Sequence, residues 1–183
     1  MSITASNVTA GDDILDTDHN KVVTDLTALD AATISIQTRF LPLSWGDAVD
    51  ASGNAVFDIG SSRVGAGNNA GTATVLKGVQ LPEGAIVTSF KVSWWVENQA
   101  TVTGTADLIL HDKLLASGQG TVMASADNTG DGEYDVEDTS ISSATIDNSN
   151  IYFVKLVMAN TAAAKFVYVA GVLITFTVVK ALP

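Results

Sequence analysis

Cysteine is absent from the 183-residue chain, which excludes a disulfide framework, thiol catalysis and zinc sites built from thiolates. Histidine occurs only twice, which leaves little for a metal site built from imidazole ligands. Basic residues are also few, with 9 Lys and Arg against 20 Asp and Glu, so the formal net charge is −11. Such a chain lacks the basic surface that neutralises phosphates, and we expect no nucleic-acid partner.

A long apolar run is missing as well. The most apolar stretch, from Phe166 to Val179, has about 14 residues and is interrupted by Gly171, whereas a membrane-spanning helix needs roughly 20. Its Val and Thr residues favour a buried strand, or two strand halves with a bulge at Gly171. The N-terminal residues contain no basic segment followed by an apolar one, so the sequence predicts neither a secretory signal nor membrane insertion.

The composition is that of a chain that forms a core. Hydrophobic residues make up 46% of the sequence and charged residues only 16%, so enough apolar surface is available for burial. The length suits one domain of moderate size with an appendage. The pattern predicts three zones: an N-terminal attachment and oligomerisation segment at 1–37, a connector at 38–71 and a β-sandwich domain at 72–183.

The N-terminal segment carries apolar residues at intervals of seven, which is typical of a helix with an a/d seam. The predicted seam consists of Leu15, His19, Val22, Leu26, Leu29, Thr33 and Ile36. A lone helix of roughly five turns is marginal in water, so it must pack on something. Two alternatives stay open: packing against its own domain, or a parallel bundle with copies of itself, which the heptad spacing favours.

The connector is rich in turn-forming residues, and its only regular element is a short strand expected at 55–59. Residues 61–71 are expected to form a loop. Trp45 is a large apolar residue in this zone, and we expect it to hold the connector against the sandwich.

Beyond residue 72 the hydrophobic pattern has a period of two, which predicts strands. One face of the first long strand is expected to carry Ile86, Phe90, Val92, Trp94 and Val96. Further strands are expected at 103–111, 114–124, 133–141, 151–158 and 165–178. Strands separated by turns predict an antiparallel β-sandwich or jelly roll. The expected fold class is therefore mainly β, with one short N-terminal helix preceding the sandwich.

Several segments of the chain resemble those of fiber-like and decoration-like virion proteins of tailed viruses. The segments that carry the resemblance are Ala10–Asn20, Leu81–Thr88, Asp138–Ile141, Ile146–Phe153 and Tyr168–Phe176. The first resembles a segment that opens many such proteins, and the others resemble their C-terminal β-sandwich. The N-terminal stretch and the β-sandwich domain to which these segments belong together cover about two thirds of the chain.

The resemblance implies a homotrimeric head fiber, decoration protein or tail fiber on the virion surface. It would be made in the host cytoplasm and mounted on capsid or tail proteins through its N-terminus. Its displayed sandwich would stabilise the particle or adhere to a host surface, with a host glycan as one partner. The resemblance implies no enzyme and no cofactor.

Three positions are candidates for a site. Trp94 and Trp95 are adjacent on a strand and face opposite ways, so we expect Trp94 in the core. Trp95 is then expected at an interface with another subunit, at the edge of the core or at a surface contact with a ligand such as a glycan, and the sequence favours the interface. Asp127, Thr129, Asp131 and Glu133 alternate as calcium ligands do, although an acidic hairpin turn explains them as well. His111 has no recognisable nucleophile partner and is expected to be a surface residue at a turn.

Two other functions stay open as alternatives. The first is a carbohydrate-binding β-sandwich module, which would use Trp95 as a platform for sugar rings. The second is a glycoside hydrolase, which needs two carboxylates some 5 to 10 Å apart in a cleft. With 20 acidic residues such a pair is compatible with the sequence, but no motif marks one.

Overall fold

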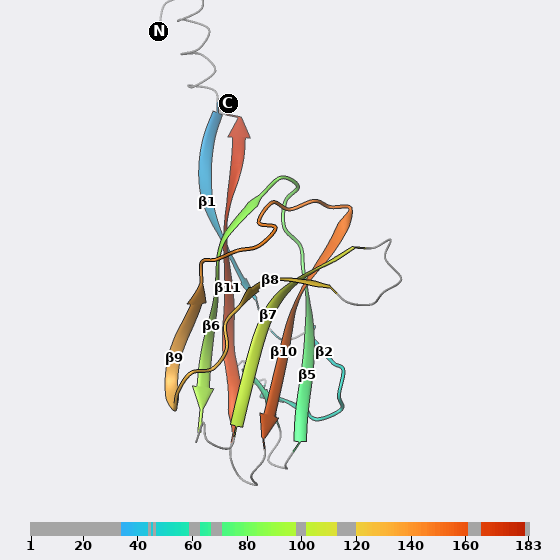
Figure 1. Ribbon diagram of the computed structural model, residues 1–183, viewed down its shortest axis with the longest axis vertical. Helices are drawn as coiled ribbons and strands as arrows, with labels where there is room; N and C mark the ends of the chain where they lie inside the picture. Colours follow the sequence, from blue (N-terminus) through green and yellow to red (C-terminus); the bar gives the residue numbers. More distant parts are fainter. Residues whose placement is uncertain are drawn as a thin grey trace, which may run out of the picture. The chain divides into compact units, whose positions relative to one another are not determined.

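The computed structural model shows a β-sandwich (Figure 1) and describes residues 34–43, 45, 47–58, 63–66, 71–97, 102–112, 120–160 and 166–181. The strands are β1 (Ile34–Leu43), β2 (Val49–Asp50), β3 (Ala55–Asp58), β4 (Arg63–Ala66), β5 (Gly71–Val79), β6 (Ile86–Val96), β7 (Val102–Asp112), β8 (Thr121–Ser125), β9 (Gly132–Asp138), β10 (Asn150–Asn160) and β11 (Val167–Ala181). Within these ranges the chain forms no helix that could span a membrane. Residues 38–178 form one compact unit, and the described residues 34–37 and 179–181 belong to another.

Two antiparallel sheets make up the sandwich. One has the strand order β3-β4-β11-β6-β9, with β1 also paired to β11, and the other has the order β2-β5-β10-β7-β8. From β4 onward the chain passes to the opposite sheet at every connection except the β7–β8 hairpin. Strands that are neighbours in a sheet are therefore mostly distant in the sequence, because the chain between them runs through the other sheet.

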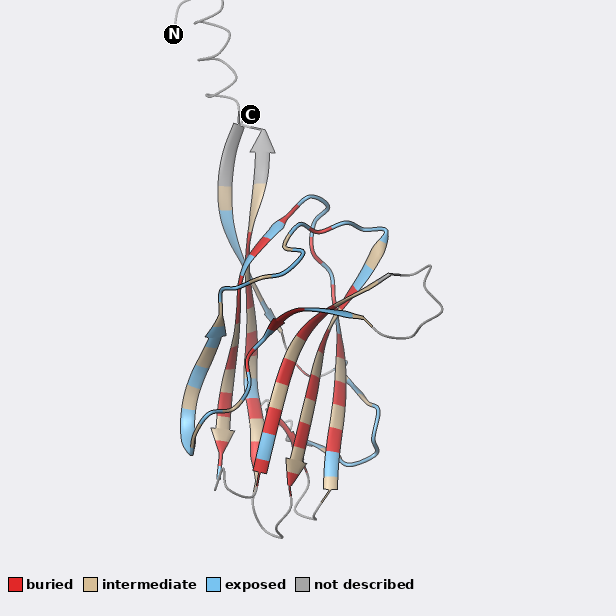
Figure 2. Cartoon of the chain, viewed as in Figure 1, coloured by how far each residue is buried: buried red, intermediate tan, exposed pale blue. Residues whose placement is uncertain are grey.

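The core lies between the sheets and follows the period-two pattern of the sequence. Figure 2 shows buried residues alternating with more exposed ones along β6, β7 and β10. The predicted inward face of β6 is confirmed at Phe90, Val92, Trp94 and Val96, all of them buried. In β10 the alternate residues Tyr152, Val154, Leu156 and Met158 are buried in the same way. Burial of each large side chain contributes about 1.5–3 kcal/mol to stability, so these two strands anchor the fold.

The expected face of β6 is wrong at its first residue. Ile86 is 45% exposed, whereas Val87 is 2% exposed and points inward. The cause is a bulge: Ser89 pairs with Thr175 and Val87 with Phe176, so Thr88 is an extra residue in β6. An extra residue inverts the alternation on one side of it, which turns Ile86 toward solvent.

Of the two alternatives for the last strand, the one with a bulge is confirmed, although the extra residue is Ala170 and not the expected Gly171. Val169 pairs with Trp94 and Gly171 with Ser93, which leaves Ala170 as the extra residue of β11. The apolar stretch of this strand is thus two half-strands that both turn their alternate residues into the core.

The N-terminal helix is not supported at its C-terminal end. Residues 34–36, which the heptad pattern placed in the helix, begin strand β1, so Ile36 is not part of a helical seam. The sequence Ile-Ser-Ile-Gln-Thr from Ile34 onward alternates apolar with polar residues and favours a strand once a partner is available. The remaining seam residues, Leu15, His19, Val22, Leu26, Leu29 and Thr33, lie outside the described residues.

The segment expected to be a connector contributes β1, β2, β3 and β4 to the two sheets. The short strand at 55–59 is confirmed as β3, but the loop at 61–71 contains β4. Trp45 is 5% exposed and belongs to the core, as expected for a residue that holds this segment against the sandwich. Val64 in β4 is fully buried, and pairing of β4 with β11 accounts for a strand that its own composition does not favour.

The turn before β6 has a clear sequence origin. The Ala85 N–H donates to the Pro82 carbonyl at 3.1 Å, and Gly84 has a φ of 70°. These features are those of a type II turn that begins at Pro82. Such a turn needs a positive φ at its third residue and therefore favours glycine there. It aims β6 into the sheet that carries the candidate site.

Candidate functional site

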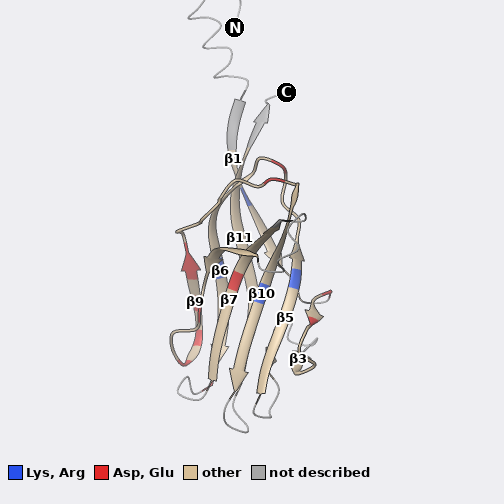
Figure 3. Ribbon diagram, turned by 45° about the vertical axis from the view of Figure 1, so that its right-hand side comes forward, with Lys and Arg blue, Asp and Glu red and all other residues tan. Residues whose placement is uncertain are grey.

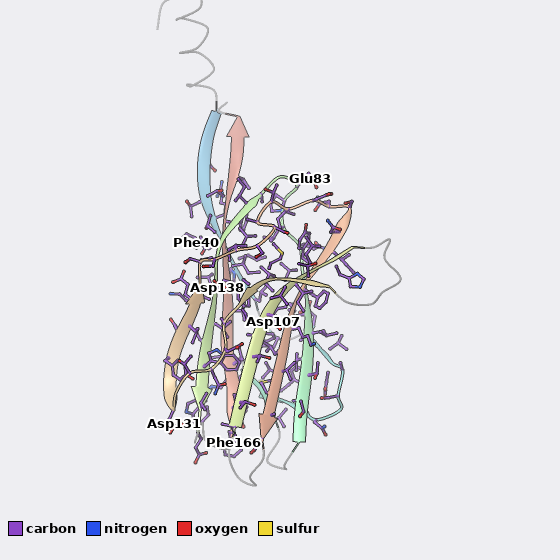
Figure 4. The ribbon with its side chains drawn as sticks, in the orientation of Figure 1. Phe40, Glu83, Asp107, Asp131, Asp138 and Phe166 are labelled. Atoms are coloured by element: carbon purple, nitrogen blue, oxygen red, sulfur yellow. The ribbon has the colours of Figure 1, made fainter. Side chains whose placement is uncertain are left out.

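The outer face of the β4-β11-β6-β9 sheet carries a row of aromatic side chains. Val64, Trp94 and Val169 fill the core, so strand alternation turns their neighbours outward. The register then sets Trp95 of β6 directly opposite Tyr168 of β11. Phe166 precedes Tyr168 by two residues and lies at the end of the sandwich where β11 begins (Figure 4). We name Phe166, Tyr168 and Trp95 the aromatic row.

The three rings are nearly parallel. The centroids of Trp95 and Tyr168 are 5.4 Å apart at an interplanar angle of 19°. The centroids of Phe166 and Tyr168 are 5.6 Å apart at 22°. The Arg63 guanidinium of β4 reaches across β11 and lies 4.5 Å from the centroid of Trp95. Stacking of this kind contributes about 0.5–1.5 kcal/mol per ring pair, and it fixes the orientation of each ring.

Gly65 makes room for the centre of the row. It pairs with Tyr168 across β4 and β11. A Cβ atom at Gly65 would lie 2.6 Å from the Val167 carbonyl oxygen and 2.7 Å from Tyr168 Cε1, closer than real Cβ atoms come. The absence of a side chain therefore lets the Tyr168 ring lie against the β4 backbone.

A hollow of about 470 Å³ opens beside Trp95 on this face. Its lining includes the side chains of Arg63, Ser93, Trp95, Glu133 and Asp135, with Ala170 of the β11 bulge. It thus combines an aromatic surface with several hydrogen-bonding groups, a composition typical of sites for small polar ligands. We name it the Trp95 hollow.

The polar wall of the Trp95 hollow is ordered by contacts between β6 and β9. The Ser93 hydroxyl donates to Asp135 Oδ1 at 2.6 Å. The Lys91 ammonium lies 3.9 Å from Asp135 and 3.9 Å from Glu137. Asp135 is thereby held between two partners while its side chain stays accessible to solvent.

A second, larger groove of about 1170 Å³ lies along β5 and β10, with Leu41, Pro42 and Leu43 at its other side. Its one cation, Lys77, is 8% exposed and forms an ion pair with Asp47. The hydrogen bond from Lys77 lowers the pKa of Asp47 below its ordinary value, against a weaker effect of desolvation. The charge of Lys77 is thus already matched, and among the described residues that line the groove there is no aromatic stack like that beside the Trp95 hollow.

The acidic turn is organised by an aromatic hydroxyl. Tyr134 Oη accepts hydrogen bonds from the backbone N–H groups of Thr129 and Gly130 and donates to the Gly130 carbonyl. Asp127, Thr129, Asp131 and Glu133 are exposed. In the described part of the chain no three His, Asp or Glu side chains come close enough to hold a metal ion. The hairpin interpretation, which the sequence favours, fits this arrangement, and calcium binding stays only an untested alternative.

His111 lies near the end of β7 and pairs with Ile151 of β10. It is half-buried, and its Nδ1 atom is buried without a hydrogen-bond partner. It lies on the other sheet from the Trp95 hollow. Trp94 is 1% exposed and donates from Nε1 to the Ala126 carbonyl at 3.0 Å, which confirms its place in the core.

Sequence reasoning found one residue of the site, Trp95, and missed its neighbours. Tyr168 and Phe166 alternate with buried valines, so their outward direction could have been deduced from the same parity rule. Arg63 fell in a segment expected to be a loop. The sequence marks Glu133 only as part of the acidic turn and a candidate calcium ligand.

No protein-family model matches the chain, and no curated protein matches it. Among solved structures, a xylan-binding module of family CBM15 is 11% identical, covers 76% of this chain and 97% of its own, and gives a TM-score of 0.49. A CBM36 module in complex with calcium and xylotriose is 14% identical over 73% and 97% of the two chains, with a TM-score of 0.47. A CBM22 xylan-binding domain from Paenibacillus barcinonensis is 13% identical over 78% and 99%, with a TM-score of 0.41. Since these TM-scores lie below 0.5, the ligands of those modules are not carried over to this chain.

Proposed function

We propose that the protein is a non-catalytic carbohydrate-binding β-sandwich that holds sugar rings in the Trp95 hollow. The observation that carries the proposal is the aromatic row, which ends in Trp95 at a hollow ringed by Arg63, Ser93, Glu133 and Asp135. One face of a sugar ring presents C–H groups that pack on an aromatic ring, while its hydroxyls need hydrogen-bond donors and acceptors at the edge. The Trp95 hollow supplies both.

The hollow favours a small polar ligand over a protein partner. Aromatic residues and arginine are also frequent at protein interfaces, but there they form a desolvated centre within a polar rim. Here charged side chains line the hollow itself, next to Trp95. In the observed conformation Arg63 lies over the Trp95 ring, so a sugar that stacks there displaces its guanidinium, which can then donate to hydroxyls.

Glu133 and Asp135 are two carboxylates in one hollow, which is the feature that a glycoside hydrolase would need. Both are exposed to solvent. A general acid for glycosidic bonds is instead a carboxyl shielded by an apolar environment. The proposal is therefore binding without cleavage, and we expect no release of reducing ends from any glycan that binds.

The test is glycan binding by the full chain and by Trp95→Ala, first on a glycan array and then by affinity electrophoresis in soluble polysaccharide. We expect Trp95→Ala to lose about 2 kcal/mol or more of binding free energy, roughly thirtyfold in affinity. Phe40→Ala is the matched control, because Phe40 is 64% exposed and lies on β1, away from the lining of the hollow. Equal loss in both variants, or retention of binding by a folded Trp95→Ala protein, would refute the proposal.

The location of the protein on the surface of a virion is a separate proposal, which rests on the sequence resemblance. A surface fiber or decoration protein of a virion would use such a hollow to adhere to a host glycan. The strand order supports the fold that the resemblance implies. The sheet β4-β11-β6-β9 faces the sheet β5-β10-β7-β8, which is the strand arrangement of a jelly roll. Immunogold labelling of particles with an antibody to this chain would test the virion location.

A further inference from the structure

The charges around the Trp95 hollow are unequal. Its lining has one cation, Arg63 of β4, and two carboxylates, Glu133 and Asp135 of β9. Figure 3 shows acidic residues along β9, where acids alternate with Tyr134 and Val136. On β6, Lys91 is shared between Asp135 and Glu137, and the part of β11 that faces the hollow carries no charged side chain.

We propose that the Trp95 hollow selects neutral glycans and rejects those that carry carboxylate or sulfate groups. The inference rests on the proposed carbohydrate-binding function and adds the class of ligand. Carboxylates accept hydrogen bonds only, so Glu133 and Asp135 are suited to the hydroxyl donors of an uncharged sugar. An anionic sugar in the same place would have its charge beside theirs, and like charges at a binding surface strongly suppress the wrong partner.

Arg63 does not reverse this selection. An arginine can hold a carboxylate with two parallel hydrogen bonds, but Arg63 faces two carboxylates in the same hollow. Lys91 already contacts two carboxylates and is not an additional free charge. The formal charge of −11 for the whole chain adds a long-range repulsion of anions at low salt.

The experiment compares neutral glycans with their charged counterparts of the same backbone, such as xylan with glucuronoxylan and unsulfated with sulfated galactans. A broad array of such pairs identifies the backbone that binds. For that backbone we expect the uronate or sulfate form to bind at least about tenfold more weakly, since one buried or close like-charge contact has an effect of that size. Equal or tighter binding of the charged form would overturn the proposal.

A charge variant tests whether the selection is local. Glu133→Gln should reduce the preference for the neutral form severalfold. Asp107→Asn changes the net charge by the same amount on the other sheet, so it should leave the preference unchanged. If both variants shift the preference equally, the overall charge and not the hollow is responsible, and the inference fails. Absence of binding to every glycan would instead refute the proposed function, which keeps the two failures distinguishable.

Discussion

Gly65 is the residue on which the aromatic row depends most directly, because Tyr168 occupies the space where its side chain would be. We expect Gly65→Ala to destabilise the protein by about 1–3 kcal/mol, the usual cost of overpacking, and to weaken glycan binding by displacing Tyr168 and Trp95. Urea unfolding and affinity electrophoresis measure the two effects.

The control for this substitution is Gly78→Ala in β5. A Cβ at Gly78 meets no atom within 4 Å, and its backbone needs no positive φ. The change should leave stability the same or raise it by about 0.5–1 kcal/mol, because alanine is less flexible than glycine in the unfolded chain. Equal destabilisation by the two substitutions would contradict the role assigned to Gly65.

Asp50 is one of two acids, with Asp47, whose lowered pKa predicts a pH dependence of stability. Desolvation raises its pKa, but hydrogen bonds from the backbone of Ala55 and Ser52, the Ser52 hydroxyl and the Gly53 N–H outweigh it and hold the pKa below 3.8. A lowered pKa in the folded state means that the unfolded chain binds more protons in acid. The contribution of Asp50 is therefore complete above about pH 5 and is lost as the pH falls through the folded-state pKa.

The measurement is urea unfolding of the protein and of Asp50→Asn at near-neutral pH and at about pH 3. The wild-type protein should be the more stable at neutral pH, and the difference should shrink in acid. The effect is modest because the side chain is near solvent. A difference that is constant with pH would show that the turn is held without the carboxylate charge.

The bulge in β11 is the element that shapes the candidate site. Ala170 is an extra residue in β11, and Val169 and Val172 on either side point into the core. Deletion of Ala170 should preserve the register on both sides and reduce stability by only about 1 kcal/mol. It should nevertheless weaken glycan binding, since Ala170 lines the Trp95 hollow.

Deletion of Lys155 in β10 is the comparison, because this strand pairs with β5 and β7 without a bulge. Loss of this one residue would turn Leu156 and Met158 outward, and each forfeits about 1.5–3 kcal/mol of burial. We expect the protein to unfold or aggregate, as judged by circular dichroism. Similar stabilities of the two deletion variants would show that the register is less constrained than the pairing indicates.

The sequence predicts those elements whose own residues alternate strictly, such as β6 and β10, and the parity rule places Trp94 inward. It fails at Ile86, because a bulge is visible only in the pairing of β6 with β11. It also fails at β4, where four residues with a central glycine become a strand through pairing with β11.

The candidate site was only partly predictable for the same reason. Trp95, Tyr168 and Arg63 come from three strands that are far apart in the sequence, and their contact depends on β11 lying between β6 and β4. Alternation gives the direction of each side chain but not its neighbours. The hollow between them follows from the strand order, which one sequence does not specify.

At the scale of the whole molecule, the heptad pattern before residue 34 predicts assembly. Light scattering after size exclusion should give about three times the 18.9 kDa of one chain, as the sequence resemblance implies. Substituting both Leu26 and Leu29 with Asp should produce a monomer, because it buries charge in the predicted seam. Thr24→Asp with Ala31→Asp, opposite the seam in the heptad, should keep the trimer. A native mass unchanged by the seam substitutions would exclude this segment as the assembly element.

The position of β11 in the sheet has a consequence for folding during translation. This strand is the last described in the chain, yet it pairs with β1, β4 and β6 and completes their sheet. Translation delivers roughly 5–20 residues per second, so the earlier strands wait for seconds with unpaired edges before β11 is made. Their pairing spans long loops, which also makes it intrinsically slow. We therefore expect the sandwich to fold after β11 has left the ribosome, with the acidic charge of the nascent chain helping to keep neighbouring copies apart.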